Sequence, residues 1–237
     1  MKFALALSML TAATAFSGAA FAQVPTQTEV GGIAIPRTRL AMMAESYVRS
    51  NEPDFLFNHS VRTFLFGALR LKAINMTFDA ETAYVAALFH DFGLVRKTAS
   101  PDVSFEIDGA NKAERFVRAN GGRPKQARIV WNAVVMHDMG RAYQRHQTPE
   151  ALLLGAGAGS DVDGIDPKEI PPATVSQILS VFPRLDFKRR FSSAAIDHCR
   201  RKPTSQIGWL DTLCRKVAPN ADRGDVEKEI ASAPFSE

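Results

Sequence analysis

Cysteine is scarce in this sequence, since Cys199 and Cys214 are the only two in 237 residues. Two cysteines this far apart cannot build a cysteine-rich zinc site, because a structural zinc ion needs four closely grouped ligands. In an oxidising compartment the two could close a disulfide loop, while two buried free thiols are the alternative. The cysteine count therefore excludes one class of metal site and leaves the state of both thiols open.

Long uncharged apolar stretches are also lacking, except at the start of the chain. Lys2 is the only charge before residue 24, and small residues lead from an apolar run into Ala20-Phe21-Ala22. This order is typical of a secretory signal peptide cleaved after Ala22, with an uncleaved membrane anchor as the alternative. We therefore expect residues 1–22 to be removed and the mature protein to be periplasmic or secreted, with no membrane contact.

Neither charge sign is in strong excess, because 29 Lys and Arg accompany 25 Asp and Glu, for a net charge of +4. The basic residues are scattered, apart from short runs at 188–190 and 200–202. A nucleic-acid-binding surface needs a basic stripe with aromatic side chains that read the bases. The two runs are better explained as solvated helix faces, and we expect no nucleic-acid partner.

Sustained two-residue alternation is absent, and almost every segment has helical period with capping residues, first-turn prolines or terminal glycines. The expected helices span residues 37–49, 54–72, 80–92, 107–120, 124–138, 148–161, 171–182, 186–201 and 205–216. The glycine-rich piece at 155–159 lacks the Gly-Lys-Ser/Thr ending of a phosphate loop and follows no strand.

These helices predict an all-α fold, a single bundle of eight or nine helices. One domain covers residues 37–218, because a chain of this length supports one well-buried core. Residues 23–36 form an extended leader before it, and residues 219–237 form a polar, frayed tail.

Histidine is rare as well, with five in the chain, yet three of them lie on the apolar faces of expected helices. His59, His90 and His137 occupy these positions, whereas His146 has no such context. One such histidine alone is more typical of a hydrogen-bonded core residue. Three together favour a functional cluster.

The pair His90-Asp91 is the most informative element. Four apolar residues precede it, so both side chains are expected to be buried at the end of a helix. A buried carboxylate costs several kcal/mol unless a cation or hydrogen-bond donors compensate it. The pair therefore indicates a metal site, although a helix that ends with Asp91 turned to solvent would have the same local sequence.

Asp161 is the expected fourth ligand, beside His59, His90 and Asp91. It follows small residues that allow close approach to another helix, and Asp163 is its rival, less favoured because a glycine follows it. Two imidazoles and two carboxylates suit one divalent metal ion, with Zn²⁺ or Fe²⁺ preferred and Mn²⁺ or Co²⁺ also suitable.

These residues form an H…HD…D pattern that resembles the HD-domain metalloenzyme superfamily. Four flanking stretches more closely resemble its cyanamide hydratase-like branch, namely residues 57–63, 88–94, 104–110 and 156–164. The resemblance extends over residues 36–195 and implies an all-α fold whose metal is ligated by His59, His90, Asp91 and Asp161.

Superfamily members with two metals have further histidines between the HD pair and the last aspartate. Only His137 combines that place with a helical apolar context, so we expect one metal and a catalytic or substrate-contacting role for His137. Glu106 is the candidate base and Asp108 a candidate substrate contact, although either would equally cap a helix N-terminus. Asn58 and Arg62 are further candidate substrate contacts, with an ion pair as the more natural role for Arg62.

Two enzymatic functions compete, and both take a small-molecule substrate. The closer resemblance implies addition of water to a small nitrile-like group such as cyanamide, and the wider superfamily implies metal-dependent phosphohydrolysis. A phosphate pocket needs Lys or Arg beside the metal, for which Arg62, Arg96 and Lys97 are the candidates. A third hypothesis is an inactive helical binding module. The sequence leaves the oligomeric state, including a homo-oligomer, open.

Overall fold

Helices account for most of the folded chain. The computed structural model describes residues 27–95, 97, 99–101, 103–140, 148–166 and 168–232. Within these ranges the strands are limited to one short pair, which confirms the expected all-α class. No helix in the described ranges is both long and apolar enough to cross a membrane. The expected signal peptide, Arg96 and His146 lie outside the described residues.

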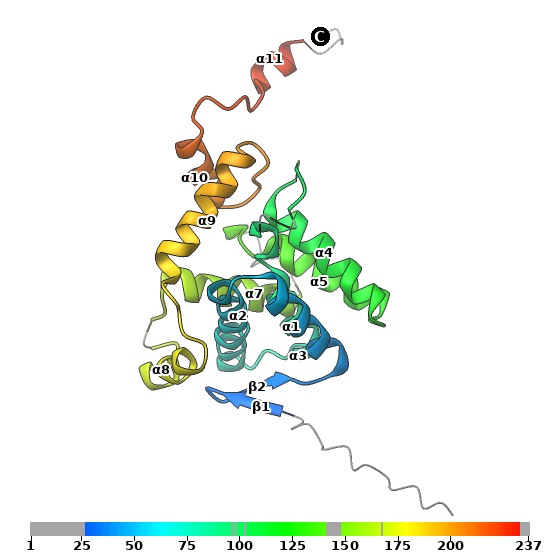
Figure 1. Ribbon diagram of the computed structural model, residues 1–237, viewed down its shortest axis with the longest axis vertical. Helices are drawn as coiled ribbons and strands as arrows, with labels where there is room; N and C mark the ends of the chain where they lie inside the picture. Colours follow the sequence, from blue (N-terminus) through cyan, green and yellow to red (C-terminus); the bar gives the residue numbers. More distant parts are fainter. Residues whose placement is uncertain are drawn as a thin grey trace, which may run out of the picture.

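Two helices, α2 (Asp54–Ala73) and α7 (Pro149–Asp163), form the centre of the bundle (Figure 1). Gly157 of α7 allows their close approach, because a Cβ atom at this position would overlap the backbone carbonyl of Thr63 in α2. The small residues of α7 therefore bring its backbone against α2, as the sequence predicted.

Gly157→Ala is expected to lower the free energy of unfolding by about 1–3 kcal/mol, because the added methyl group must displace the backbone of α2. Gly159→Ala is the matched control, since its Cβ would meet only the Asp163 carboxylate at 3.9 Å. Alanine is favoured over glycine inside a helix by roughly 0.8–1 kcal/mol, so the control should be at least as stable as the wild type. Urea unfolding compares the two variants, and equal stabilities would contradict the close packing.

Four more helices surround this centre. They are α1 (Arg39–Asn51), α3 (Ala80–Phe89), α4 (Phe105–Ala119) and α5 (Pro124–Met136). Four of these helices, α7 included, begin at a cap residue whose side-chain oxygen accepts a hydrogen bond from a backbone N–H group of the first turn. The cap residues are Thr38, Asp79, Ser104 and Thr148. Such caps satisfy donors that have no partner inside the helix, which explains why these helices begin close to the predicted positions.

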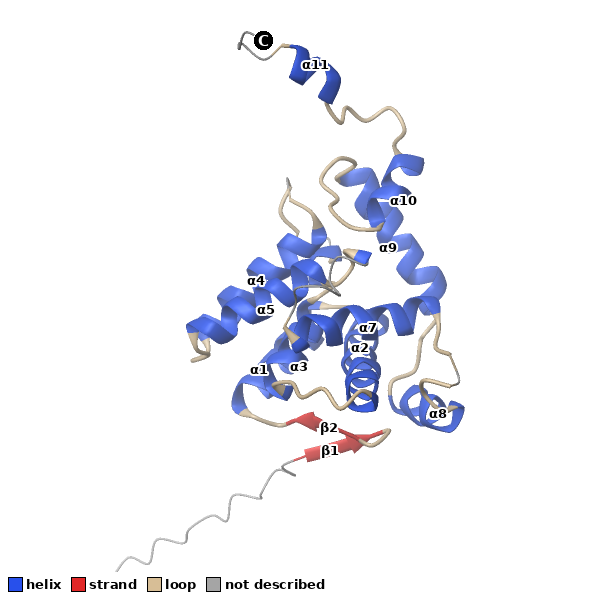
Figure 2. Ribbon diagram, turned by 180° about the vertical axis from the view of Figure 1, so that it is seen from behind, coloured by secondary structure: helices blue, strands red, loops and turns tan. Residues whose placement is uncertain are grey.

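Residues 27–36 form an antiparallel hairpin, where the sequence predicted only an extended leader. Its strands are β1 (Gln27–Val30) and β2 (Ile33–Pro36), seen at the lower end of the bundle in Figure 2. Gly31 and Gly32 form the turn with φ angles of 62° and 78°, which glycine adopts without strain. The hairpin buries three apolar side chains, those of Val30, Ile33 and Ile35. Strands of four residues are too short for alternation to be recognised.

The C-terminal helices are α8 (Pro172–Val181), α9 (Phe187–Arg201), α10 (Leu210–Val217) and α11 (Val226–Ala231). Cys199 of α9 and Cys214 of α10 form a disulfide, which selects the first of the two alternatives for these thiols. Helix α10 begins later than the predicted residue 205, and α11 lies in the predicted tail, where it projects from the body (Figure 1).

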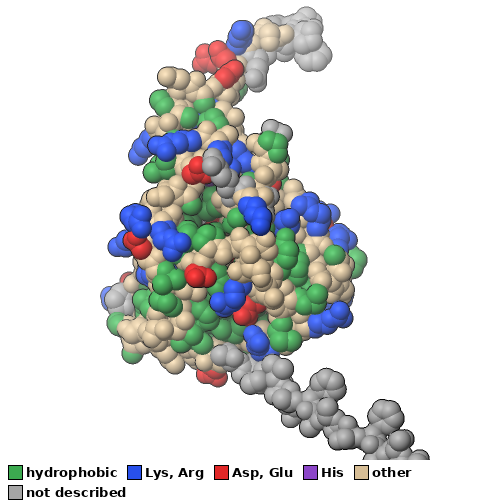
Figure 3. Space-filling view, in the orientation of Figure 1, with side chains coloured by type: hydrophobic (Ala, Val, Ile, Leu, Met, Phe, Trp, Pro, Cys, Tyr) green, Lys and Arg blue, Asp and Glu red, His purple; other side chains and the backbone are tan. Residues whose placement is uncertain are grey.

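The two basic runs differ in environment. Lys188 and Arg189 are exposed on α9, as expected of a solvated helix face, whereas Lys202 is buried and forms an ion pair with Asp108 at 2.7 Å. On the face seen in Figure 3, basic side chains are scattered among hydrophobic and acidic ones. This face therefore has no basic stripe of the kind that nucleic-acid binding requires.

Candidate metal centre

The histidine–aspartate pair closes α3. His90 keeps helical backbone angles at the end of this helix, and Asp91 precedes the 3-10 turn η1 (Phe92–Leu94). Both side chains are buried. His90 Nδ1 donates a hydrogen bond to the carbonyl of Ala87 at 2.7 Å. This bond fixes the ring with its Nε2 atom directed into the interior.

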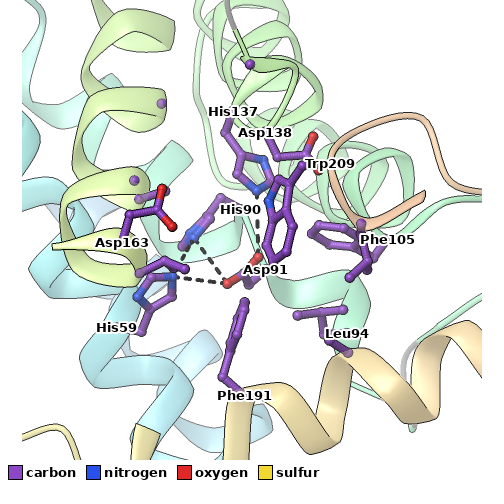
Figure 4. Close-up of a pocket in the computed structure, with 17 residues that line it drawn as sticks. His59, His90, Asp91, Leu94, Phe105, His137, Asp138, Asp163, Phe191 and Trp209 are labelled. Atoms are coloured by element: carbon purple, nitrogen blue, oxygen red, sulfur yellow. Dashed lines mark hydrogen bonds and ion pairs between the residues drawn. The ribbon is translucent and has the colours of Figure 1, made fainter. Parts of the chain in front are cut away.

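His59, from the middle of α2, meets this pair. Its Nε2 atom is 3.2 Å from His90 Nε2 and 3.2 Å from Asp91 Oδ2. His90 Nε2 is also 3.2 Å from that oxygen. The three atoms form a triangle, marked by dashed lines in Figure 4, and among the described residues they are the group with metal-ligand spacing. We call His59, His90 and Asp91 the metal triangle.

The metal triangle consists of hydrogen-bond acceptors. His59 Nδ1 donates to Asp161 Oδ2 at 2.7 Å, as His90 Nδ1 does to its backbone carbonyl. In the neutral rings each Nε2 atom therefore carries a lone pair that faces Asp91, whose buried Oδ2 has no donor within the described ranges. Converging acceptors are costly to bury without a cation. Metal–ligand bonds of about 2.0–2.2 Å are compatible with the 3.2 Å separations.

The electrostatics of the metal triangle favour an ionised carboxylate. Burial opposes ionisation of Asp91, but the neighbouring imidazole rings of His90 and His59 hold its pKa well below the ordinary value. Burial lowers the pKa of His90, so this ring is neutral at pH 7. Burial also disfavours a charged His59, but the carboxylates of Asp161 and Asp91 raise its pKa, because both would accept hydrogen bonds from the protonated ring. A proton on His59 and a metal ion therefore compete for the same place.

Asp161 lies on the opposite edge of the His59 ring and does not join the metal triangle. Its Oδ1 accepts hydrogen bonds at 2.9 Å from both Arg62 and Arg184, and its Oδ2 accepts one from Arg62 at 2.7 Å. The predicted direct ligation is therefore corrected, because Asp161 orients a ligand through a hydrogen bond, as carboxylates commonly do for metal-binding histidines. The rival Asp163 is exposed and lines the cavity described below.

Three predicted substrate contacts are engaged elsewhere. Asn58 donates to the carbonyl of Pro183 at 2.9 Å, and the fully buried Arg62 forms the predicted ion pair, with Asp161. Asp108 accepts a hydrogen bond from Lys202 at 2.7 Å. None of the three lines the cavity. Their partners lie about a hundred residues away in the chain, so local sequence could not reveal them.

His137 lies beside the metal triangle. Its Nδ1 donates to the carbonyl of Val134 at 2.6 Å, so the lone pair of the neutral ring is on Nε2, 3.7 Å from Asp91 Oδ1. Glu106 is fully buried and does not reach the cavity, which corrects its predicted role as a base in contact with substrate. Asp138, which interacts with Glu106, does line the cavity.

A cavity of about 360 Å³ opens onto the metal triangle. Its apolar wall comes from segments far apart in the sequence and includes Leu94, Phe105, Phe191 and Trp209 (Figure 4). Leu210 also belongs to this wall. Its polar wall adds His137, Asp138 and Asp163 to the metal triangle. No lysine or arginine in the described part of the chain lines the cavity. Of the predicted phosphate contacts, Arg62 is paired with Asp161 and Lys97 lies outside the lining.

Sequence reasoning missed Asp138, Phe191 and Trp209. Asp138 follows His137, so the sequence contains a second His-Asp pair that could have pointed to this residue. The stretches that carry the family resemblance did not include it. The two aromatic residues belong to α9 and to the turn before α10, and no sequence pattern connects these segments with residue 91.

Comparison with known protein families identifies one part of the chain. Residues 56–121 match the family model of the HD domain. The matched stretch runs from α2 through η1 to the end of α4, and it contains the complete metal triangle and Glu106. Among curated proteins, none matches the chain.

Proposed function

We propose, from the match of residues 56–121 to the HD-domain family model and from the geometry of the cavity, that the protein adds water to a small, uncharged, nitrile-like substrate. The metal triangle would hold one divalent ion, Zn²⁺ or Fe²⁺ in preference to Mn²⁺ or Co²⁺, because its donors are imidazole nitrogen and carboxylate oxygen. Such an ion supplies Lewis acidity to a water molecule and to the substrate.

The charge of the cavity lining is the observation that favours an uncharged substrate. Three carboxyl side chains line the cavity, from Asp91, Asp138 and Asp163, and no described lysine or arginine balances them. Phosphate groups are normally bound by arginine or lysine side chains. An anionic phosphate ester would therefore be attracted only by the metal ion. A neutral compound with N–H groups could instead donate hydrogen bonds to the carboxylates of the lining.

The protein supplies a candidate base and an apolar wall that would exclude water. The tautomer of His137 leaves its Nε2 lone pair beside Asp91, so this atom would take a proton from the attacking water. Phe105, Phe191 and Trp209 cover the apolar side of the cavity and would exclude bulk water from it. A cavity of about 360 Å³ accommodates a compound of only a few heavy atoms with room to spare.

Metal-dependent phosphohydrolysis is the second candidate, because it is the function that the resemblance to the wider HD-domain superfamily implies. Incubating the metal-loaded protein separately with cyanamide and with p-nitrophenyl phosphate separates the two functions. Release of urea without inorganic phosphate is the expected result, and Asp91→Ala is the control. Phosphate release without urea would overturn the first proposal. If the protein binds no metal and releases neither urea nor phosphate, the inactive binding module would be favoured.

We also propose that the protein is exported. The disulfide between Cys199 and Cys214 supports export, because disulfides persist in oxidising compartments and are rare in the cytosol. N-terminal sequencing of the protein recovered outside the cytoplasm is expected to begin at Gln23. A protein that begins at Met1 would contradict signal cleavage.

A further inference from the structure

We propose that Asp138 is a further catalytic residue of this cavity and shares one proton with Glu106, which serves as its positioning residue. The inference rests on the proposed function for the reaction in which the proton is used. The sharing of the proton itself rests only on how the two carboxyl groups are buried.

The two carboxyl groups lie within hydrogen-bonding reach of each other and have no other polar side-chain partner among the described residues. Glu106 stands on the first turn of α4 and has no exposed surface, while Asp138 follows α5 and is 6% exposed. The four side-chain oxygens of Glu106 and Asp138 have no hydrogen-bond partner of ordinary geometry among the described residues. The nearest donors are the backbone N–H groups of Glu106, Asp138 and Trp209. A proton on one of the two groups supplies the missing donor.

Adjacent buried carboxylates cannot both be ionised, because like charges repel and burial penalises each charge. Burial and the neighbouring Asp138 raise the pKa of Glu106 to about 8. Burial raises the pKa of Asp138 to about 6, although the hydrogen bond from Glu106 partly opposes this increase. At neutral pH the proton therefore resides on Glu106, whose carboxyl O–H donates a hydrogen bond to the Asp138 carboxylate. Among the described residues, His137 and Asp91 are the further titratable groups that act on the pair.

The turn before α10 shields the pair from water. A Cβ atom at Gly208 would overlap the carboxylate of Asp138, so glycine permits this turn to close on it. The backbone N–H of Trp209 donates to the Asp138 carbonyl at 3.4 Å, which holds the turn in place. Asp138 nevertheless lines the cavity, so it is the member of the pair that reaches a substrate.

The pair would act as the acid of the hydration. As the water oxygen bonds to the nitrile carbon, one water proton passes to His137, and one C–N π bond breaks. Glu106 passes the shared proton to Asp138, Asp138 delivers it to the nitrogen, and the pair is left without a proton. The resulting imidic acid becomes the amide by moving a proton from oxygen to nitrogen, and His137 returns its proton to the pair through water, so no proton is gained or lost.

Kinetics as a function of pH test this role. The wild-type kcat is expected to fall as the pH rises through about 8, where the pair loses its proton. In Glu106→Gln this limb should move to lower pH, because Asp138 then loses its proton alone, and activity should recover toward pH 6. Asp138→Asn should lower kcat by about 10²–10⁴-fold, the usual range for a general acid, with a smaller change in KM.

Glu114→Gln is the matched control on the same helix, because Glu114 pairs with Arg118 away from the cavity. Its pH profile should follow the wild type. If Glu106→Gln lowers kcat equally at every pH and does not shift the alkaline limb of the profile, the proposal of a shared proton is wrong. Glu106 would then have a purely structural role.

Two measurements on the metal-free protein need no substrate. Infrared difference spectra between wild type and Glu106→Gln at pH 7 should contain the carbonyl band of a protonated carboxylic acid, which titrates near pH 8. A carboxyl group with a raised pKa in the folded protein costs increasing stability as the pH rises to that pKa. The Tm of Glu106→Gln should therefore exceed that of the wild type by a margin that grows from pH 5 to pH 8.

The two proposals fail in different ways. Absence of the acid band together with a constant Tm difference would overturn the proton-sharing pair even if the enzyme is active. Presence of both signals in a protein that hydrates no nitrile-like compound would support the pair and overturn the proposed function.

Discussion

Asp91→Ala is expected to lower kcat/KM for hydration by about three orders of magnitude, because Lewis-acid catalysis contributes several kcal/mol of transition-state stabilisation. Asp91 is the carboxylate on which both Nε2 lone pairs converge, so its removal leaves the ion with two imidazole ligands. Elemental analysis should show a matching loss of bound metal. Steady-state urea release measures the effect on activity.

Asp163→Ala is the control for this variant, because Asp163 also lines the cavity but stands outside the metal triangle. It should keep its metal, whatever it does to KM. If instead Asp163→Ala loses the metal and Asp91→Ala retains it, the ligand assignment is wrong and the rival considered from the sequence is the true carboxylate ligand.

Asp161→Asn is expected to have the largest effect on stability, a loss of about 3–5 kcal/mol in the free energy of unfolding. Arg62 has no exposed surface and forms both of its carboxylate hydrogen bonds with Asp161, so the variant leaves a buried guanidinium charge without a counter-ion. Metal affinity should also fall by about 10–100-fold, because His59 loses the carboxylate that orients it. Urea unfolding and isothermal titration with Zn²⁺ measure the two effects.

The stability effect of Asp161→Asn should depend on pH in a defined direction. Burial opposes ionisation of Asp161, but hydrogen bonds from His59 and Arg62 lower its pKa far below the ordinary value. Its stabilisation is therefore complete above the unfolded pKa of about 3.9 and is lost as the pH falls toward the folded pKa. The difference between wild type and variant should shrink below about pH 4.

Arg184→Ala tests how much of the stabilisation comes from the partly exposed Arg184 and not from the buried ion pair between Arg62 and Asp161. Arg184 contacts the same carboxylate, but its side chain is 30% exposed and solvent screens the interaction. The expected loss is about 1 kcal/mol or less. A loss as large as that of Asp161→Asn would show that the stabilisation does not come from the burial of Arg62.

Local signals in the sequence predicted most of the helices. Asp79 and Thr148 mark helix starts because a side-chain oxygen caps the first turn, and both do so in the structure. The N-terminal hairpin was missed because its alternation extends over only four residues in each strand. The start of α10 was placed too early, because residues 205–209 form the turn that closes on Asp138 instead of a helical turn.

The metal triangle was accessible from the sequence because His90 and Asp91 are adjacent and their apolar context implies burial. The sequence predicted Asp161 as a ligand beside His59, whereas in the structure a hydrogen bond joins the two. Its arginine partners, one of which comes from residue 184, were not predicted. Charge pairing across about a hundred residues, as between Asp108 and Lys202, has no local signature. The same holds for Phe191 and Trp209, which only the packing of α9 and α10 brings to the cavity.

The most direct test of a shared ion is anomalous diffraction from crystals of the protein grown with Zn²⁺ or Fe²⁺. A single peak is expected within about 2.0–2.2 Å of His59 Nε2, His90 Nε2 and Asp91 Oδ2, with Asp161 hydrogen-bonded to the far side of the His59 ring. Absence of a peak at saturating metal, or a peak bonded to Asp161 and remote from Asp91, would contradict this account.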